Sequence, residues 1–311
     1  MDSATHESKA GQALNWIVLL ILVVVWGSTF AIIKIGVETI DPAWLVTGRL
    51  WIGALFLGCW MIGEAVLRRP RQRARTNVKW GPALVWYGLI GVVFTAVPFV
   101  FYAIAAQSVS SAVLAICNGG TPFFTAILAH FLVATEKLSV RRVIGVGMGF
   151  AGLVILVAPE LREGVSARVI GLVLAIVGAA LYAGTNVATR RAPVLSPVMS
   201  SFLIIGSGAL AMAFAAPFLA PFPSEASVAS LLAMAALGIL PTGMAYILYV
   251  WLIRQAGTVF TSFTTYLSPL WATGISLVFL HEPLQVTMVA AMAMIFAGVA
   301  IANHTPRRRG G

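Results

Sequence analysis

The chain has 311 residues, of which 60% are hydrophobic and only 10% are charged, and its net charge is +10. Soluble domains contain about 25% charged residues, so this composition excludes a water-soluble globular protein and indicates that most of the chain faces lipid. The basic residues lie in short gaps between apolar runs, which favours a role in membrane orientation over nucleic-acid binding.

Residues 1–13 form a polar tail, and ten apolar runs follow, each near the roughly 20 residues that a helix needs to cross a bilayer. The first run lacks a cleavage site with small residues, so we expect a retained helix. Continuous apolar runs without period-two alternation predict an all-α membrane protein. The expected spans are 14–37, 42–63, 80–106, 110–133, 140–158, 168–189, 195–219, 227–253, 258–280 and 283–303, followed by a basic tail at 304–311.

The distribution of basic residues predicts the orientation. Sixteen of the twenty Lys and Arg residues fall on one side of the membrane when the N-terminus is placed in the cytoplasm. Cytoplasmic segments carry this excess, so we expect an inner or plasma membrane protein with both termini cytoplasmic. The four remaining residues are Lys34, Arg49, Arg162 and Arg168.

The two halves of the chain echo each other. The pairs Pro122 and Pro269, and Glu136 and Glu282, are each about 150 positions apart. Each half, 14–158 and 168–303, contains five expected spans, an odd number, so the second half enters the membrane upside down. The expected fold is therefore ten transmembrane helices in two inverted five-helix repeats around a central cavity, with access alternating between the two sides.

Three stretches resemble the EamA-type transporters of the drug/metabolite transporter superfamily. They are Trp26-Gly27-Ser28-Thr29-Phe30 with Lys34, Pro42 and Arg49-Leu50 after it; Ala105-Ala106-Gln107-Ser108; and the proline–helix–glutamate segments after Pro122 and Pro269. The resemblance covers residues 16–303. It implies a cavity lined by helices 1, 3, 4, 6, 8 and 9, and it implies export of small metabolites. Amino-acid exporters of the family, including exporters of aromatic amino acids, are similar to this chain in length and layout.

Charged side chains near the membrane have both structural and functional interpretations. All ten acidic residues lie outside the expected spans or at their ends, so no midplane carboxylate is available for proton coupling. Glu136 and Glu282 are expected to stabilise the positive ends of helices 5 and 10, with gating as the alternative. Lys34 and Arg49 either reach the interface or pair with Glu38 or Asp41, or else they attract an anionic group such as a substrate carboxylate.

Aromatic and polar side chains gather in the spans that the resemblance assigns to the cavity. Polar groups are costly in lipid, so we expect most of them to face inward. Pro98, Pro122, Pro241 and Pro269 are expected to free backbone carbonyls and kink these helices. The predicted cavity residues are Trp26, Ser28, Thr29, Thr95, Phe99, Tyr102, Asn118, Thr121, Tyr182, Asn186, Tyr246, Tyr249, Thr265 and Tyr266.

No motif for catalysis or ATP hydrolysis is present, and we expect no cofactor and no metal. Cys59 and Cys117 lie within apolar runs without paired spacing, so we expect packing thiols. The sequence therefore predicts a secondary transporter that exports small metabolites, with amino acids favoured. The alternatives are broad efflux of toxic organic compounds and a non-transporting membrane scaffold or enzyme. The expected partners are a small-molecule substrate and the lipid bilayer, with no nucleic acid. Both a monomer and a homo-oligomer are compatible with the sequence.

Overall fold

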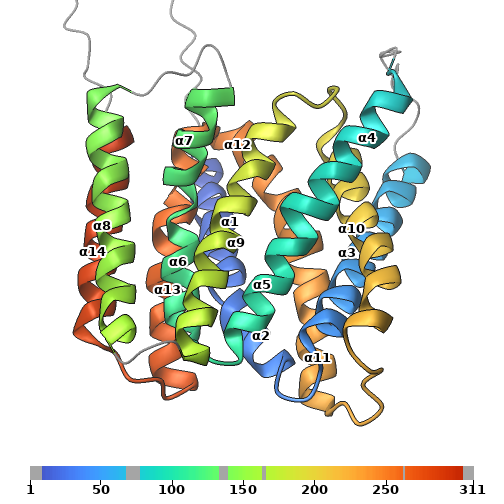
Figure 1. The fold of residues 1–311 in the computed structure, drawn as a ribbon. Coiled ribbons are helices and arrows are strands. Elements are labelled where there is room, and N and C mark those ends of the chain that lie inside the picture. Colours follow the sequence, from blue (N-terminus) through green and yellow to red (C-terminus); the bar gives the residue numbers. More distant parts are fainter. Residues whose placement is uncertain (1–8, 68–77, 133–138, 163–165, 262, 304–311) are drawn as a thin grey trace, which may run out of the picture.

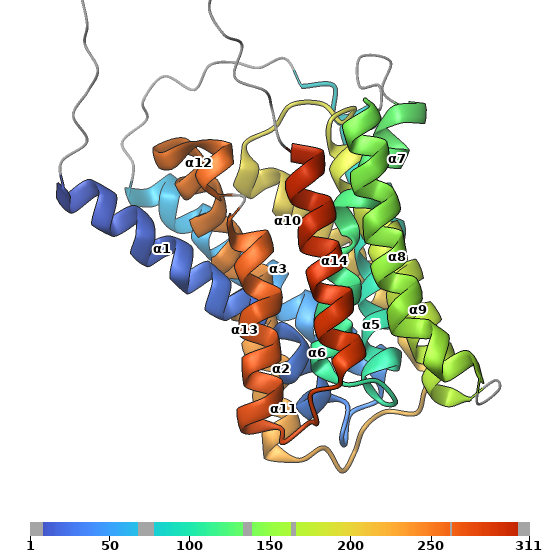
Figure 2. The ribbon, with the colours of Figure 1, turned by 90° about the vertical axis from the view of Figure 1, so that its left-hand side faces the viewer.

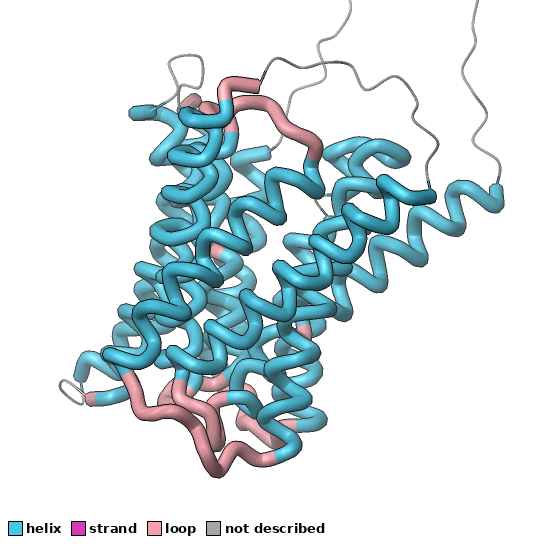
Figure 3. Tube along the Cα trace, turned by 90° about the vertical axis from the view of Figure 1, so that its right-hand side faces the viewer, coloured by secondary structure: helices cyan, strands magenta, loops and turns pink. Residues whose placement is uncertain are grey.

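The computed structural model describes residues 9–67, 78–132, 139–162, 166–261 and 263–303. In this part the chain consists of helices and short loops without strands, which confirms the all-α fold predicted from the sequence (Figure 1). The helices run between two ends of a bundle, and the loops gather at those ends (Figure 3). The role expected of Glu136 concerns a residue outside the described part.

Several expected spans are built from more than one helical segment. In chain order the described segments are α1 (Lys9–Gly27), α2 (Thr29–Gly36), α3 (Pro42–Leu67), α4 (Trp80–Gly91), the π-helix η1 (Val92–Ala96), α5 (Val97–Ala106), α6 (Ser111–Gly119), α7 (Thr121–Leu132), α8 (Val140–Arg162), α9 (Ala167–Thr189), α10 (Pro197–Leu219), α11 (Val228–Leu237), the π-helix η2 (Gly238–Met244), α12 (Ala245–Thr261), α13 (Phe263–Phe279) and α14 (Val286–Asn303).

Eight helices in the described part are long and apolar enough to cross a membrane, so the chain is a multi-pass membrane protein. Four of these eight combine segments: α1 with α2, α4 with η1 and α5, α6 with α7, and α11 with η2 and most of α12. The last two expected spans, 258–280 and 283–303, contain the shorter helices α13 and α14, which have 17 and 18 residues.

Serine side chains fix where four helices begin. Ser110, Ser166, Ser196 and Ser227 each accept a hydrogen bond from the backbone N–H three residues later, at the starts of α6, α9, α10 and α11. Such a cap satisfies one of the N–H groups that the first helical turn leaves without a partner. The loops before these helices therefore have defined end points.

Glycines let α8 and α14 pack backbone to backbone. A Cβ atom on Gly145 would lie 2.4 Å from the carbonyl oxygen of Gly298, and one on Gly298 would lie 2.5 Å from the carbonyl oxygen of Gly145. Small residues allow such close approach in lipid, where burial of apolar surface does not drive helix association. Figures 1 and 2 show the two helices side by side at the edge of the bundle.

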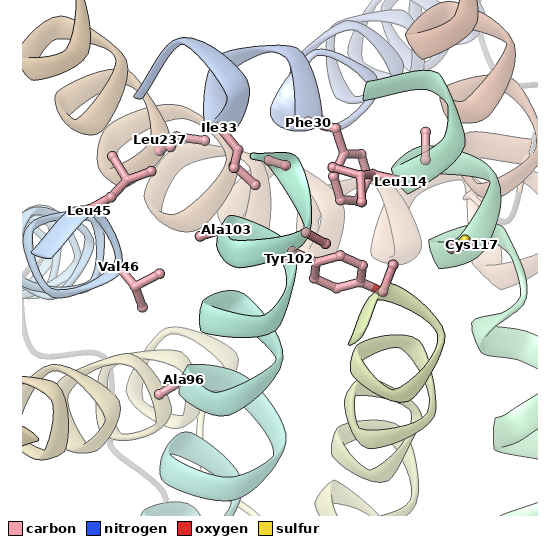
Figure 4. Packing of buried hydrophobic residues seen from close by; sticks show 14 of the residues in the cluster. Phe30, Ile33, Leu45, Val46, Ala96, Tyr102, Ala103, Leu114, Cys117 and Leu237 are labelled. Carbon is pink, nitrogen blue, oxygen red and sulfur yellow. The ribbon is translucent and has the colours of Figure 1, made fainter. Parts of the chain in front are cut away.

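The largest packed core joins α2, α5 and α6 to α3 and α11. Figure 4 shows Phe30, Tyr102 and Leu114 meeting within it, and the two rings lie 5.2 Å apart edge to face. Cys117 is buried in this core, as its apolar surroundings predict, whereas Cys59 is exposed. This core therefore holds the segments at one end of the bundle together.

Candidate functional site

A cavity of about 890 Å³ lies between the helices. Its wall includes residues of the expected cavity helices, and α3, α8, α10 and α14 contribute further residues. Small-molecule sites typically have volumes of roughly 300–1,000 Å³, so this cavity has room for a metabolite.

The structure places most of the predicted cavity residues on this wall. They come from segments far apart in sequence, and the cavity brings their aromatic rings, hydroxyls and amides together. The predicted residues on the wall are Trp26, Thr29, Thr95, Phe99, Tyr102, Asn118, Thr121, Tyr182, Asn186, Tyr246, Tyr249 and Thr265, together with Arg49.

Three predicted residues stand apart from this group. Ser28 is not among the lining residues, and its hydroxyl accepts a hydrogen bond of 3.0 Å from the indole Nε1 of Trp271. Lys34 is also absent from the lining and forms an ion pair with Glu282. The side chain of Tyr266 lies outside the described part.

Arg49 is the charged side chain most deeply placed on the cavity wall. It projects from α3, is only 6% exposed, and donates a 2.9 Å hydrogen bond from Nε to the hydroxyl of Thr242 in η2. Its guanidinium carbon lies 3.8 Å from the centroid of the Phe99 ring, a cation–π contact. The hydroxyl and the ring hold the guanidinium plane in a fixed position.

Two pairs of aromatic rings line the same cavity as this guanidinium. The indole of Trp26 donates a 3.3 Å hydrogen bond to the carbonyl oxygen of Pro241, the residue before Thr242, and its ring lies 5.2 Å from that of Tyr249. The rings of Phe99, which covers the guanidinium, and Tyr182 stack at 6.3 Å. Flat apolar surfaces therefore lie next to a positive charge.

Proline and threonine explain why the helices around the cavity are broken. Proline lacks the N–H that would bind the carbonyl four residues earlier, so that carbonyl needs another donor. Before Pro98, Pro122 and Pro241, the freed carbonyls accept threonine hydroxyls. The three hydrogen bonds run from Thr185 to Phe94 at 2.7 Å, from Thr121 to Asn118 at 2.7 Å, and from Thr242 to Leu237 at 2.8 Å.

One end of the cavity is packed shut. Phe30, Ile33 and Tyr102 are buried there, and the Tyr102 hydroxyl donates a 3.0 Å hydrogen bond to the side-chain oxygen of Asn118. The other end is open to solvent, since the lining residues Asn186 and Arg190 are exposed. This open end lies where α8 begins and α9 ends (Figure 1).

Glu282 connects three elements beyond the closed end. One carboxylate oxygen pairs with Lys34 of α2, and the other accepts hydrogen bonds from the backbone N–H and hydroxyl of Ser111, both at 3.0 Å. Ser276 of α13 also donates to this carboxylate. Two expectations are therefore corrected: Lys34 pairs with Glu282 rather than with Glu38 or Asp41, and the carboxylate of Glu282, from the loop before α14, binds the N-terminus of α6.

The environment of Glu282 favours its charged form. Burial raises the pKa of the carboxyl group, but the hydrogen bonds from Lys34 and Ser276, the charge of Lys34 and the hydrogen bond from Ser111 outweigh it. The pKa of Glu282 therefore lies below its ordinary value. A carboxylate that binds the first N–H groups of a helix also interacts favourably with the helix dipole.

Several residues that matter for this arrangement were not predicted from the sequence. Thr242 was not among the predicted cavity residues, although its hydroxyl, like that of Thr95 in η1, binds a carbonyl five residues earlier, at 2.8 Å for Thr242 and 3.1 Å for Thr95. Ser111 and Ser276 were not connected with Glu282. A threonine next to a mid-span proline is the signal that could have identified Thr242.

Comparisons with known proteins agree with this architecture. The model of the EamA-like transporter family matches residues 14–158 and 169–303. An uncharacterized transporter of Bacillus subtilis, YoaV, is 22% identical over 94% of this chain and 97% of its own length. A transporter of S-adenosylmethionine and S-adenosylhomocysteine from Chlamydia trachomatis is 23% identical over 92% of this chain and 88% of its own length.

A solved crystal structure has a similar fold. It matches with a TM-score of 0.62 and 22% identity, covering 95% of this chain and 99% of the other. At this identity the match concerns the fold alone. The matched family and the two named relatives are transporters rather than enzymes.

Proposed function

Because the chain belongs to the EamA-like transporter family, we propose that it is a secondary transporter that exports small metabolites by alternating access, without ATP. Amino acids, aromatic ones included, are the substrate class that the cavity suits best. The observation that carries this proposal is the central cavity, which combines aromatic walls with a fixed guanidinium and has one closed and one exposed end.

The proposed architecture is ten spans in two inverted five-helix halves, 14–158 and 168–303. Reciprocal packing supports it: η1 packs on α10 while η2 packs on α3, and α5 packs on α9 while α12 packs on α1. The breaks in the cavity helices fit the same proposal, since discontinuous helices form the substrate sites of many inverted-repeat transporters.

Alternating access requires one end of the site to close while the other opens. In the proposed mechanism the structure represents an inward-open state. The buried side chains around Tyr102, and the bonds of Glu282 beyond them, would close the outer end. The positive charge near Arg142 and Arg190 at the open end supports a cytoplasmic location for that end.

The proposal includes no coupling to a proton gradient. The described residues on the cavity wall include three arginines and no aspartate or glutamate. Since an intramembrane carboxylate is the usual ion carrier, we propose movement down the substrate gradient.

A second candidate is efflux of larger organic molecules that combine a flat ring with a charge. The Chlamydia relative is named as a transporter of S-adenosylmethionine and S-adenosylhomocysteine. The paired rings of Trp26 and Tyr249 could hold an adenine base or a sulfonium group. Both compounds therefore belong in any substrate panel.

Cells that overproduce the protein test the proposed direction and substrate class. They would be loaded with dipeptides that release phenylalanine, tryptophan, alanine or glutamate inside, and the amino acids appearing outside would be measured. We expect faster release of the aromatic residues than from cells producing Trp26→Ala at equal protein level. Equal release from both strains would contradict the proposal.

A further inference from the structure

Arg49 presents a charge that the described part of the protein leaves without a counter-ion. The side chain is buried on the cavity wall, and its hydrogen bond within that part runs from Nε to Thr242. No aspartate or glutamate is among the described residues that line the cavity. A buried charge is costly unless it is paired, so a charged group on a ligand is the natural partner.

The free edge of the guanidinium has the geometry for a carboxylate. The bond to Thr242 uses Nε, and the Phe99 ring covers the face, so within the described part both Nη groups remain available. Two parallel N–H groups bind a carboxylate in bidentate fashion, which adds orientation as well as attraction.

An aromatic surface lines the same part of the cavity wall. Trp26 and Arg49 are anchored to the consecutive residues Pro241 and Thr242, so the indole and the guanidinium meet the same short segment of η2. The ring of Tyr249 extends this surface. A ligand whose carboxylate meets Arg49 can therefore place an apolar or aromatic group on the indole.

Resting on the proposed transport function, we infer that Arg49 is the specificity-determining residue that binds the carboxylate of the substrate. The substrates are then small aromatic or apolar carboxylates, amino acids among them, and amines that lack a carboxylate are rejected. Arg142 and Arg190 at the open end raise the local concentration of such anions.

A ligand series on the unchanged protein tests this inference without relying on transport. Purified protein would be titrated with L-phenylalanine, L-phenylalaninamide, phenethylamine and 3-phenylpropionate, and binding would be followed by the shift in thermal unfolding. The two compounds with a carboxylate should bind at least about tenfold more tightly than the two without one. Equal binding of all four would overturn the role of Arg49 even if transport is established.

Variants then connect the preference to Arg49. Arg49→Gln should reduce the ratio of affinities for L-phenylalanine and L-phenylalaninamide to about one, and Arg49→Lys should retain part of it. Arg254→Gln, which removes an exposed charge of α12 outside the cavity wall, is the matched control. A purely structural role of Arg49 would weaken both ligands equally and leave the ratio unchanged, and that result would overturn the inference. Carboxylate-dependent binding without any transport would instead contradict the proposed function alone.

Discussion

Lys34 and Glu282 form an ion pair across 248 positions of sequence, between α2 and the loop that joins α13 to α14. Ser111 binds the same carboxylate, so the start of α6 joins the pair. These three elements lie at the closed end of the cavity and would have to separate for that end to open. The ion pair therefore provides a direct test of alternating access.

Glu282→Gln should favour opening of the closed end, because it removes the ion pair and weakens the bonds to Ser111. Charge-assisted hydrogen bonds contribute about 1.5–3 kcal/mol, but Lys34 is partly exposed, so we expect about 1–2 kcal/mol. This corresponds to a roughly 5–30-fold larger open population. The open population would be measured with Ala115→Cys, a buried cavity position, in a background without Cys59 and Cys117. The rate at which an impermeant reagent outside cells labels this cysteine reports the opening.

Glu225→Gln is the matched control, since it removes an exposed carboxylate from the α10–α11 loop at the same end of the bundle. Its labelling rate should equal that of the parent protein. Should Glu282→Gln also leave the rate unchanged, the ion pair does not hold this end closed.

The closed end should be sensitive to acid only below the ordinary carboxyl range. The pKa of Glu282 in the folded protein lies below its ordinary value of 4.5, so its stabilising effect is complete at neutral pH. This effect is lost as the pH falls through the depressed pKa, where the carboxylate takes up a proton. Labelling of Ala115→Cys should therefore accelerate only in strongly acidic medium, and Glu282→Gln should abolish this dependence. Acceleration that begins near neutral pH would point to another group.

The aromatic wall should control transport more than folding. Trp26→Ala removes the ring that lies against Tyr249, and we expect transport to fall at least about tenfold at equal protein level. Tyr102 also packs in the buried core, so Tyr102→Phe is the informative change; it removes the bond to Asn118 and should cost transport about two- to tenfold. Leu55→Ala, an exposed position, is the control. Normal transport by both variants would contradict the cavity assignment.

The contact between α8 and α14 should tolerate no added methyl group. Gly145→Ala would place Cβ 2.4 Å from a backbone oxygen of α14, whereas Gly147→Ala on the same helix meets no atom within 4 Å. We expect Gly145→Ala to lower the free energy of unfolding by about 1–3 kcal/mol, and Gly147→Ala to change this free energy little. Thermal unfolding in detergent measures both, and equal stability would show that the helices do not meet at this surface.

The composition of the cavity wall could be predicted because polar side chains are costly in lipid. That cost indicated that Asn118, Thr121 and Tyr182 face inward, and all three line the cavity. The prolines predicted the freed carbonyls, three of which accept threonine hydroxyls. The inward-facing residues could thus be predicted from composition, and the freed carbonyls from the backbone chemistry of proline.

The partners of the charged residues could not be predicted in the same way. Proximity in sequence suggested Glu38 or Asp41 as the ion-pair partner of Lys34, whereas the fold brings Glu282 to it. Asp41 instead accepts a hydrogen bond from the backbone N–H of Ala43. Arg49 meets Thr242 from the other half of the chain. Such contacts depend on how distant helices pack, which periodicity and spacing do not specify.

Counterflow in liposomes tests the transport proposal most directly. Purified protein would be reconstituted with unlabelled L-phenylalanine inside, and uptake of labelled L-phenylalanine would be followed with and without an imposed pH gradient. We predict transient accumulation of the label that requires the internal amino acid, that changes less than about twofold with the pH gradient, and that Trp26→Ala reduces at least about tenfold. Absence of counterflow for every aromatic amino acid would contradict the proposed substrates, and strong accumulation driven by the pH gradient would contradict uncoupled transport.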